Sequence, residues 1–521
     1  MFKATFYTLS IVFILELIFF SLIRGADGDT GVYISFVYQV VQGALPYRDF
    51  WYQQGIGYMW FLCPIASVVG HSFFYHKIYF FVFSCLNALI LVLIIKRYLE
   101  DQKIALSKNI FWYCSVTILG SFSFWFQMVS LGTKSSLVCL LIMSAFYAMQ
   151  RFWSNHKIIL LILAGFFYGA LLSTKLNFLG VPLAVNLLLL CHQNRLKNLV
   201  IFNVAILCMI VIFHTPYLSF EGLTMIKENF KLTKDTYPET ELSGLLLIRF
   251  HIYKILEIMN FHLMKYMPFA FAFYLTIIHF QISKLGALLK KDKLICLLVL
   301  QFIIYSCSNI IMLYPHFFLV HYQPPYIFLL LLSILWIIKI TNQDEDVMKS
   351  FQSVAQFWIP FSVIFLWTNV SFLWTENITV LGGGLLDFKY HILGNNKPTK
   401  HLNTLKAEGY ENYLFIGLSN HWVINSQLRE SSFSVSGSSP MAVRAKNQIL
   451  PDRETANRVP MIAASNMDDL LNKHTVIILE PKALEFTILD YKYLVQCINQ
   501  KGFIRSFADD QLEIYKSVKN F

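Results

Sequence analysis

The acidic and basic side chains that could do chemistry stand in short segments between long apolar runs. The candidates are Asp27, Asp29, Arg48, Asp49, Lys134, Lys175 and His321. An aspartate beside a bound hydroxyl can accept its proton or orient it for attack. A cation at the same place can neutralise negative charge that grows on a leaving phosphate. These residue types favour acid–base and phosphate chemistry next to the apolar runs.

Each candidate also has a simpler interpretation. Asp29 precedes a predicted helix and can be its N-cap, whereas Asp27 stands before a glycine, as turn residues do. Asp49 can form an ion pair with Arg48. The lysines at helix ends can extend toward water while their stems stay in the apolar layer. The sequence leaves both interpretations open for every candidate.

The elements that must position these residues are membrane-spanning helices. Of the 521 residues, 56% are hydrophobic and 14% are charged, whereas soluble domains carry about 25% charged residues. Apolar runs of spanning length predict a polytopic α-helical membrane protein with about eleven transmembrane helices. The predicted spans are 5–23 (an uncleaved first helix), 73–95, 109–128, 135–152, 157–174, 177–192, 198–216, 264–284, 293–313, 323–340 and 353–374.

Basic residues concentrate in every second connection between these spans, which predicts a cytoplasmic N-terminus. The short connections on the other side hold few cations, namely Arg24, Arg48, Lys77 and Lys134. The net charge of +11 (42 basic minus 31 acidic residues) therefore reflects topology and does not indicate nucleic-acid binding. The nine cysteines show no CxxC or zinc-like spacing, so we expect no metal site built on sulfur.

The predicted organisation is a transmembrane region over residues 1–375 followed by an extracytoplasmic domain over 376–521. The transmembrane region includes two long connections, 24–72 (the first outer loop) and 217–262. In the C-terminal domain, residues 413–417, 476–479 and 512–515 have the composition of buried strands. Helix-like stretches lie near 467–473 and 484–499. We therefore expect a small α/β or α+β domain.

The first outer loop has helical periodicity of its own. After Asp29, apolar residues recur at helical spacing, namely Tyr33, Phe36, Val37, Val40 and Val41. Ser35, Gln39 and Gln42 lie on the opposite face. This pattern predicts a short amphipathic helix that lies flat on the membrane and ends at Gly43. Residues 56–69 predict a second interfacial helix, or one that enters the membrane partway.

These features resemble the GT-C glycosyltransferases that use lipid-phosphate sugars, the broad family of protein O-mannosyltransferases and aminoarabinose transferases. The resemblance rests first on Asp29, Tyr33 and Gly43, an acidic residue four before a tyrosine in a helix that ends in glycine. It also rests on the segment Pro46-Tyr47-Arg48-Asp49-Phe50, and on His321-Tyr322 followed by Pro324 and Pro325. One departure is Gln54-Gly55-Ile56, where the aminoarabinose branch has Lys-Pro-Pro.

The resemblance implies an inverting transfer of a monosaccharide from a polyprenyl-phosphate donor to an acceptor glycan, lipid or protein. Asp29 would be the catalytic residue. The implied substrate-binding residues are Asp27, Tyr33, Arg48, Asp49, Lys134, Lys175, His321 and Tyr322. His321 and Tyr322 also fit an ordinary interfacial belt. No cofactor follows from the sequence, and a divalent cation stays open. The expected location is a bacterial inner membrane, with the endoplasmic reticulum as the alternative.

A transporter or flippase of lipid-linked sugars is the competing function. Transporters place ionisable residues at mid-membrane and break their helices with Gly or Pro. Here the predicted helix interiors are nearly free of charge, and the charged groups gather in the outer loops. This distribution favours chemistry at the membrane surface over a path across it. A non-catalytic scaffold is a third interpretation that only an assay separates.

Overall fold

The computed structural model describes the chain in segments, and the statements below concern those segments. They are residues 28–47, 55–69, 73–105, 135–191, 194–219, 221–224, 226–227, 292–312, 323–341, 396–416, 426–430, 475–481, 491–509 and 512–518, with a few single positions. The predicted spans 5–23, 264–284 and 353–374, and most of 109–128, lie outside them.

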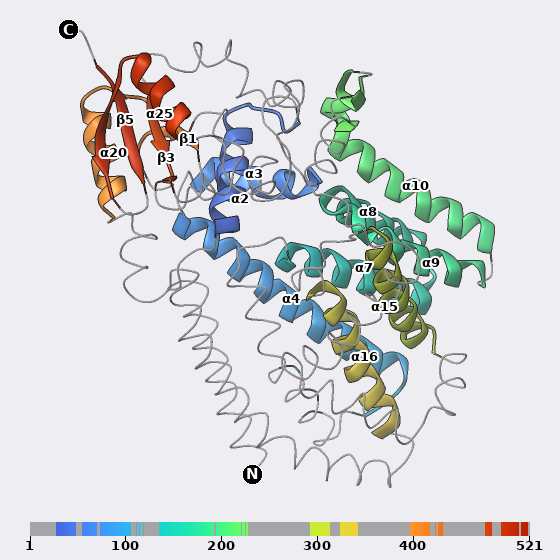
Figure 1. Ribbon diagram of the computed structural model, residues 1–521. Coiled ribbons are helices and arrows are strands. Elements are labelled where there is room, and N and C mark those ends of the chain that lie inside the picture. Colours follow the sequence, from blue (N-terminus) through green and yellow to red (C-terminus); the bar gives the residue numbers. More distant parts are fainter. Residues whose placement is uncertain are drawn as a thin grey trace, which may run out of the picture.

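Apolar helices make up the N-terminal two-thirds of the described chain (Figure 1). They are α2 (Gly28–Val41), α3 (Gly57–Val69), α4 (Phe73–Asp101), α7 (Ser135–Asn155), α8 (Ile158–Thr174), α9 (Gly180–Leu190), α10 (Arg195–His214), α15 (Lys293–Met312) and α16 (Gln323–Thr341), with the 3-10 turns η2 (Leu176–Phe178) and η3 (Thr215–Tyr217). A helix therefore lies at each predicted span that falls in the described segments.

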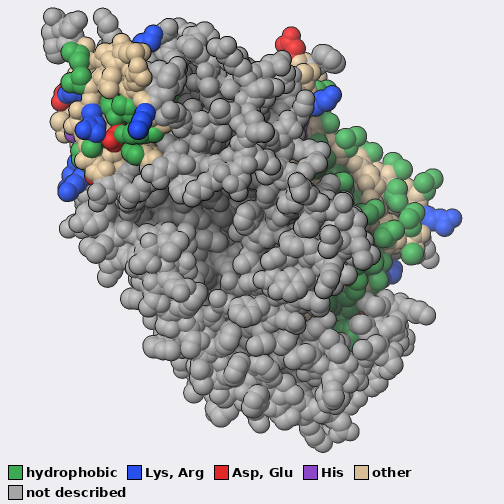
Figure 2. All heavy atoms as spheres, in the orientation of Figure 1, with side chains coloured by type: hydrophobic (Ala, Val, Ile, Leu, Met, Phe, Trp, Pro, Cys, Tyr) green, Lys and Arg blue, Asp and Glu red, His purple; other side chains and the backbone are tan. Residues whose placement is uncertain are grey.

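By length and composition, three of the described helical segments could cross a membrane: Phe81–Asp101, Ser136–Asn155 and Arg195–Tyr217. On α10, Val200, Val204, Leu207 and Val211 recur at helical spacing and are each at least 39% exposed. Figure 2 shows hydrophobic side chains gathered along this helix. An apolar stripe of this kind suits contact with lipid acyl chains.

Small residues allow α8 and α10 to pack closely. A Cβ at Gly165 would lie 2.6 Å from the Cβ of Ala205, and one at Gly169 would lie 2.6 Å from the carbonyl oxygen of Ile206. Close backbone approach at small residues is a common way for helices to associate in lipid. Residue numbers rise in the same direction along both helices at these contacts, so α8 and α10 are parallel. Both helices therefore end at the same end of the bundle.

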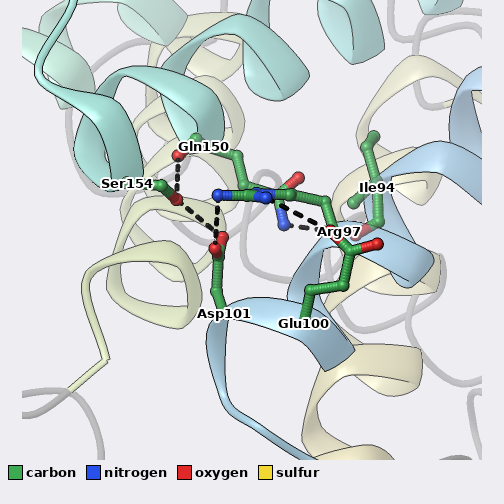
Figure 3. Close-up of polar contacts among 6 residues, drawn as sticks. All are labelled: Ile94, Arg97, Glu100, Asp101, Gln150 and Ser154. Carbon is green, nitrogen blue, oxygen red and sulfur yellow. Dashed lines mark hydrogen bonds and ion pairs between the residues drawn. The ribbon is translucent and has the colours of Figure 1, made fainter.

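Polar contacts fix the parallel pair α4 and α7 at two places along their length. At one end, the amide of Asn87 donates to the carbonyl of Ser136 (2.8 Å). At the other, Gln150 donates to Ile94 (3.2 Å) and Ser154 donates to Asp101 (2.7 Å). Figure 3 shows this second group, in which Arg97 also pairs with Asp101 and Glu100. The pair therefore has a defined register.

A buried carboxylate ties α4, α15 and α16 together at this second end. Asp292 accepts hydrogen bonds from the backbone N–H groups of Leu294 (3.1 Å) and Ile295 (3.2 Å) and so caps α15. The hydroxyl of Tyr98 donates to the same carboxylate (2.6 Å), and Lys339 pairs with it at 3.4 Å. A buried charge needs such partners.

The C-terminal segments form a five-stranded mixed sheet in the order β2-β1-β3-β5-β4. Its strands are β1 (Asn412–Ile416), β2 (Arg429–Glu430), β3 (Thr475–Leu479), β4 (Phe503–Ala508) and β5 (Glu513–Ser517). Strand β1 is parallel to β2 and β3, whereas β5 is antiparallel to β3 and β4. Strands β1, β3 and β5 overlap the predicted strands, whereas β2 and β4 were not predicted.

Helices pack on both faces of this sheet because its central strands are apolar on both sides. Tyr413 and Phe415 face α20 (Lys397–Ala407), which contributes Leu402. The alternate residues Leu414 and Ile416 share a cluster with Ile498 of α25 (Tyr491–Gln500). Helix α25 overlaps the predicted helical stretch 484–499, α20 was not predicted, and 467–473 lies outside the described segments. The sheet with its two helices is an α/β arrangement.

The first-outer-loop helix differs from its prediction in two respects. Helix α2 begins at Gly28, which puts Asp29 in its first turn and not at the N-cap position before it. Gln39, predicted on the polar face, is 1% exposed, whereas Gln42 is exposed as expected. Helix α2 packs against both α3 and α4, and this packing explains the burial. The helix does end before Gly43, whose φ is +96°.

Candidate functional site

The candidate site lies where the first outer loop meets the ends of α8 and α10. Lys175 ends α8 in an extended conformation (φ −154°, ψ 104°), and its N–H still donates to the carbonyl of Leu171. Its ammonium lies 6.0 Å from the centroid of the Phe178 ring, which stacks on Tyr305 of α15 at 4.6 Å. The break between two apolar helices thus presents a cation beside aromatic rings.

Two glycines bring the first outer loop against the residues just before Lys175. A Cβ at Gly55 would lie 2.2 Å from the carbonyl oxygen of Ser173, and one at Gly57 would lie 2.8 Å from Oγ1 of Thr174. Real Cβ atoms do not approach this closely, so a glycine is required at each position. The start of α3 therefore packs directly on the end of α8 and fixes Lys175 beside the loop.

The same loop is also held to the end of α10. The indole N–H of Trp60 donates to the carbonyl of Phe213 (2.9 Å), and the hydroxyl of Tyr217 donates to the carbonyl of Pro46 (2.7 Å). The rings of Tyr47 and Tyr217 meet edge to face at 5.5 Å. Contacts between residues more than 150 positions apart hold the loop over the bundle end.

Tyr47 has an unusual backbone. Its φ is +66°, a left-handed conformation that non-glycine residues rarely adopt and that persists only where surrounding contacts enforce it. Tyr217 supplies two such contacts, through its ring against Tyr47 and its hydrogen bond to Pro46. Burial, and to a smaller extent the neighbouring Tyr217 phenol, raises the pKa of Tyr47, so its hydroxyl stays neutral.

Of the predicted site residues, the structure describes the side chain of Lys175. Asp29 and Tyr33 lie in α2, but their side chains are outside the described part of the chain. The others outside it are Asp27, Arg48, Asp49, Lys134, His321 and Tyr322. Because α2 packs against α3, the helix that carries Asp29 belongs to the same assembly as Lys175. The convergence of the remaining residues stays a prediction.

Several residues of this assembly were not singled out from the sequence. Gly55, Gly57 and Tyr217 hold the loop, and the G-x-G spacing of the two glycines was the available signal. Within the described segments, no group of three or more His, Cys, Asp or Glu side chains is placed to hold a metal ion.

No protein-family model matches the sequence, and no curated protein matches it. Among solved structures, the chain is similar to the crystal structure of ArnT from Cupriavidus metallidurans in the apo state. The TM-score is 0.55 at 12% sequence identity, and the match covers 98% of this chain and 97% of that one. At this identity the similarity establishes the fold. The chain is a polytopic helical membrane protein with the GT-C fold of ArnT, an aminoarabinose transferase.

Proposed function

We propose that the chain is an inverting glycosyltransferase that moves a monosaccharide from a polyprenyl-phosphate donor to an extracytoplasmic acceptor. The observation that carries the proposal is the placement of Lys175. In a chain with the fold of ArnT, this cation stands at a helix break, fixed by the close contact of Gly55 and Gly57 with Ser173 and Thr174. Such a place suits a phosphate at the membrane surface.

The proposed reaction is a single displacement. The acceptor hydroxyl oxygen attacks the anomeric carbon from the side opposite the phosphate, and its proton passes to the carboxylate of Asp29. The bond between the anomeric carbon and the phosphate oxygen breaks, and polyprenyl phosphate leaves. Lys175 neutralises the growing negative charge. The other proposed substrate-binding residues are Asp27, Tyr33, Arg48, Asp49, Lys134, His321 and Tyr322.

A transfer assay tests the reaction directly. The purified protein is placed in lipid nanodiscs with undecaprenyl phosphates bearing different radiolabelled monosaccharides and with an extract of envelope glycolipids, glycans and proteins. We expect label to move to an acceptor with release of undecaprenyl phosphate, and parallel reactions with EDTA show whether a divalent cation takes part. Movement of intact donor across a vesicle bilayer without transfer would support the flippase interpretation. If the protein showed neither transfer nor donor movement, the scaffold interpretation would remain.

Donor binding tests the role of Lys175. Replacing it by Ala removes a charged hydrogen-bond donor and should weaken donor binding by roughly ten- to a hundredfold. Lys157 is the matched control because it is exposed at the opposite end of α8. Lys157→Ala should bind donor normally. If Lys175→Ala also bound normally, Lys175 would be an interfacial anchor only.

A further inference from the structure

Hydrogen-bonding side chains without partners are buried inside the apolar helical region. In such surroundings polar groups are normally few and paired. Among the residues of the described helices that depart from this rule, five lie toward one end of the bundle and are each at most 3% exposed: Gln39, Ser84, Asn87, Ser136 and Ser173. The atoms without a hydrogen-bond partner are both amide atoms of Gln39, Oδ1 of Asn87 and the three serine hydroxyls. We call this set the polar group.

The polar group lies at the end of the bundle that carries the first outer loop. Asn87 donates to the backbone of Ser136, and Ser84 lies one helical turn from Asn87 on the same side of α4. Helices α7 and α8 form an antiparallel hairpin, so the end of α8 at Ser173 lies where α7 begins. Ser173 is the residue that Gly55 contacts.

Gln39 joins this set from the loop itself. It lies on α2, which packs against both α3 and α4. Lys175 follows Ser173 by two positions. Neutral hydrogen-bonding groups from four helices and one cation therefore belong to a single end of the molecule.

The other end of the same helices looks different. Gln150 keeps one amide oxygen without a partner there, but Ser154, Asp101 and Glu100 are all engaged in hydrogen bonds or ion pairs (Figure 3). Between α9 and α10, Asn186 and Asn203 satisfy each other with two amide hydrogen bonds of 3.1 and 3.0 Å. Within the described helices, Gln150 and Gln301 each keep one amide oxygen without a partner, whereas six such atoms, on Gln39, Ser84, Asn87, Ser136 and Ser173, lie at the end beside the loop.

We propose that the polar group binds the hydroxyl groups of the donor's sugar while Lys175 binds its phosphate; this inference rests on the proposed function. Leaving a buried amide or hydroxyl without a partner destabilises the folded chain, and a ligand that both donates and accepts removes that penalty. Sugar hydroxyls do both. A phosphate only accepts, and it would leave the oxygens of Gln39 and Asn87 unpaired.

Binding measurements with two lipids test the assignment. The probes are undecaprenyl phosphate and the same lipid bearing a monosaccharide, each titrated into full-length protein in nanodiscs. The variants are Gln39→Met, Ser84→Ala and Ser136→Ala, which replace unpaired polar atoms by apolar ones of similar or smaller size. Each should lower affinity for the preferred sugar-bearing lipid by roughly two- to tenfold, as expected for one hydrogen bond. Affinity for bare undecaprenyl phosphate should not change.

The ligand-free variants add a second readout. A ligand-binding role predicts an unchanged or raised melting temperature, because an unsatisfied group has been removed, whereas a structural role predicts a lower one. Gln150→Met is the control, because it makes the same replacement as Gln39→Met at the opposite end of the helices. It should retain the wild-type preference for the sugar-bearing lipid.

The assignment would be overturned if the variants lost affinity equally for both lipids, had a lower melting temperature, or kept the wild-type preference for the sugar-bearing lipid. It would also be overturned if the wild-type protein bound no sugar-bearing lipid more tightly than bare undecaprenyl phosphate. The binding measurements and the transfer assay test the sugar site and the proposed reaction separately. Transfer with the preference intact in all variants rejects the sugar site alone. Loss of the preference in a protein that transfers nothing rejects the proposed reaction and keeps the site.

Discussion

At the scale of single residues, the proposed chemistry divides between a base and a cation. Asp29 lies in the first turn of α2, and the start of a helix favours a negative charge, which suits the proposed role of its carboxylate as the proton acceptor. Lys175 stands at the end of another helix, fixed by glycine contacts on the residues before it. The two residues come from segments that only the folded chain brings into one assembly.

Replacing Asp29 by Asn tests the base. Asparagine is nearly the same size and removes the proton acceptor, so transfer should fall by about 10²–10⁴-fold in the radiolabel assay. Protein yield and donor binding should stay near those of the wild type. Asp27→Asn is the control and should have a milder effect if Asp27 is a turn residue. Near-normal transfer by Asp29→Asn would leave Asp29 a role in stabilising the helix start and make Asp27 or Asp49 the next candidate.

At the scale of elements, contacts between α3 and α8 decide whether the site exists. Gly55, just before α3, and Gly57, its first residue, lie directly against Ser173 and Thr174 of α8. Gly57→Ala would set a Cβ 2.8 Å from both the Ser173 carbonyl carbon and the Thr174 hydroxyl, and α3 would have to shift. Overpacking of this kind costs about 1–3 kcal/mol. We expect a lower melting temperature and weaker donor binding, measured in detergent and in nanodiscs.

Gly43→Asn provides the comparison. Gly43 has φ +96°, but nothing lies within 4 Å of a Cβ there, and asparagine tolerates positive φ better than most residues. This variant should lose little stability. If Gly57→Ala were as stable and as active as the wild type, the close contact between α3 and α8 would not control the site.

The C-terminal sheet contains a charged group whose protonation should affect stability. Burial raises the pKa of Glu513, but hydrogen bonds from Tyr491 and Tyr515 and the ion pair with Arg505 (3.0 Å) together lower it below its ordinary value of 4.5. The carboxylate therefore stabilises the fold above about pH 4.5, and this contribution is lost as the pH falls through the lowered pKa.

Limited proteolysis of the full-length protein between about pH 7 and pH 3 measures this effect, with a protease active over that range. The wild-type C-terminal fragment should resist cleavage at neutral pH and become susceptible in acid. Glu513→Gln should be more susceptible at neutral pH and show a weaker dependence on pH. An identical pH profile for both proteins would contradict a stabilising role for the carboxylate.

At the scale of the whole molecule, the fold and the distribution of charge give a consistent arrangement. Helices α8 and α10 are parallel and end beside the first outer loop, whereas the charged groups around Asp292 and Asp101 lie at the opposite end. Figure 1 shows the C-terminal sheet toward the end of the molecule that carries α2 and α3. We propose that this end faces away from the cytoplasm.

Reporter fusions test the orientation. A reporter that is active only outside the cytoplasm should be active when fused after Phe521 and silent when fused after Arg195, because basic residues favour the cytoplasmic side. The opposite pattern would place the first outer loop in the cytoplasm and remove the argument for extracytoplasmic transfer.

The sequence by itself determined the features that depend on local pattern. Hydropathy located the apolar helices, the composition of buried strands located β1, β3 and β5, and Gly43 marked the end of α2. The order of motifs in the first outer loop led to the GT-C fold, which the similarity to ArnT confirms.

Only the tertiary structure decided which segments meet. Gln39 belongs to the polar side of an amphipathic pattern, yet contacts with other helices bury it. The contact of Gly55 with Ser173, the hydrogen bond from Tyr217 to Pro46 and the strand order of the sheet join residues far apart in the chain. Periodicity records which face of an element is apolar. It does not record which partner covers that face, because the partner is set by packing across the whole molecule.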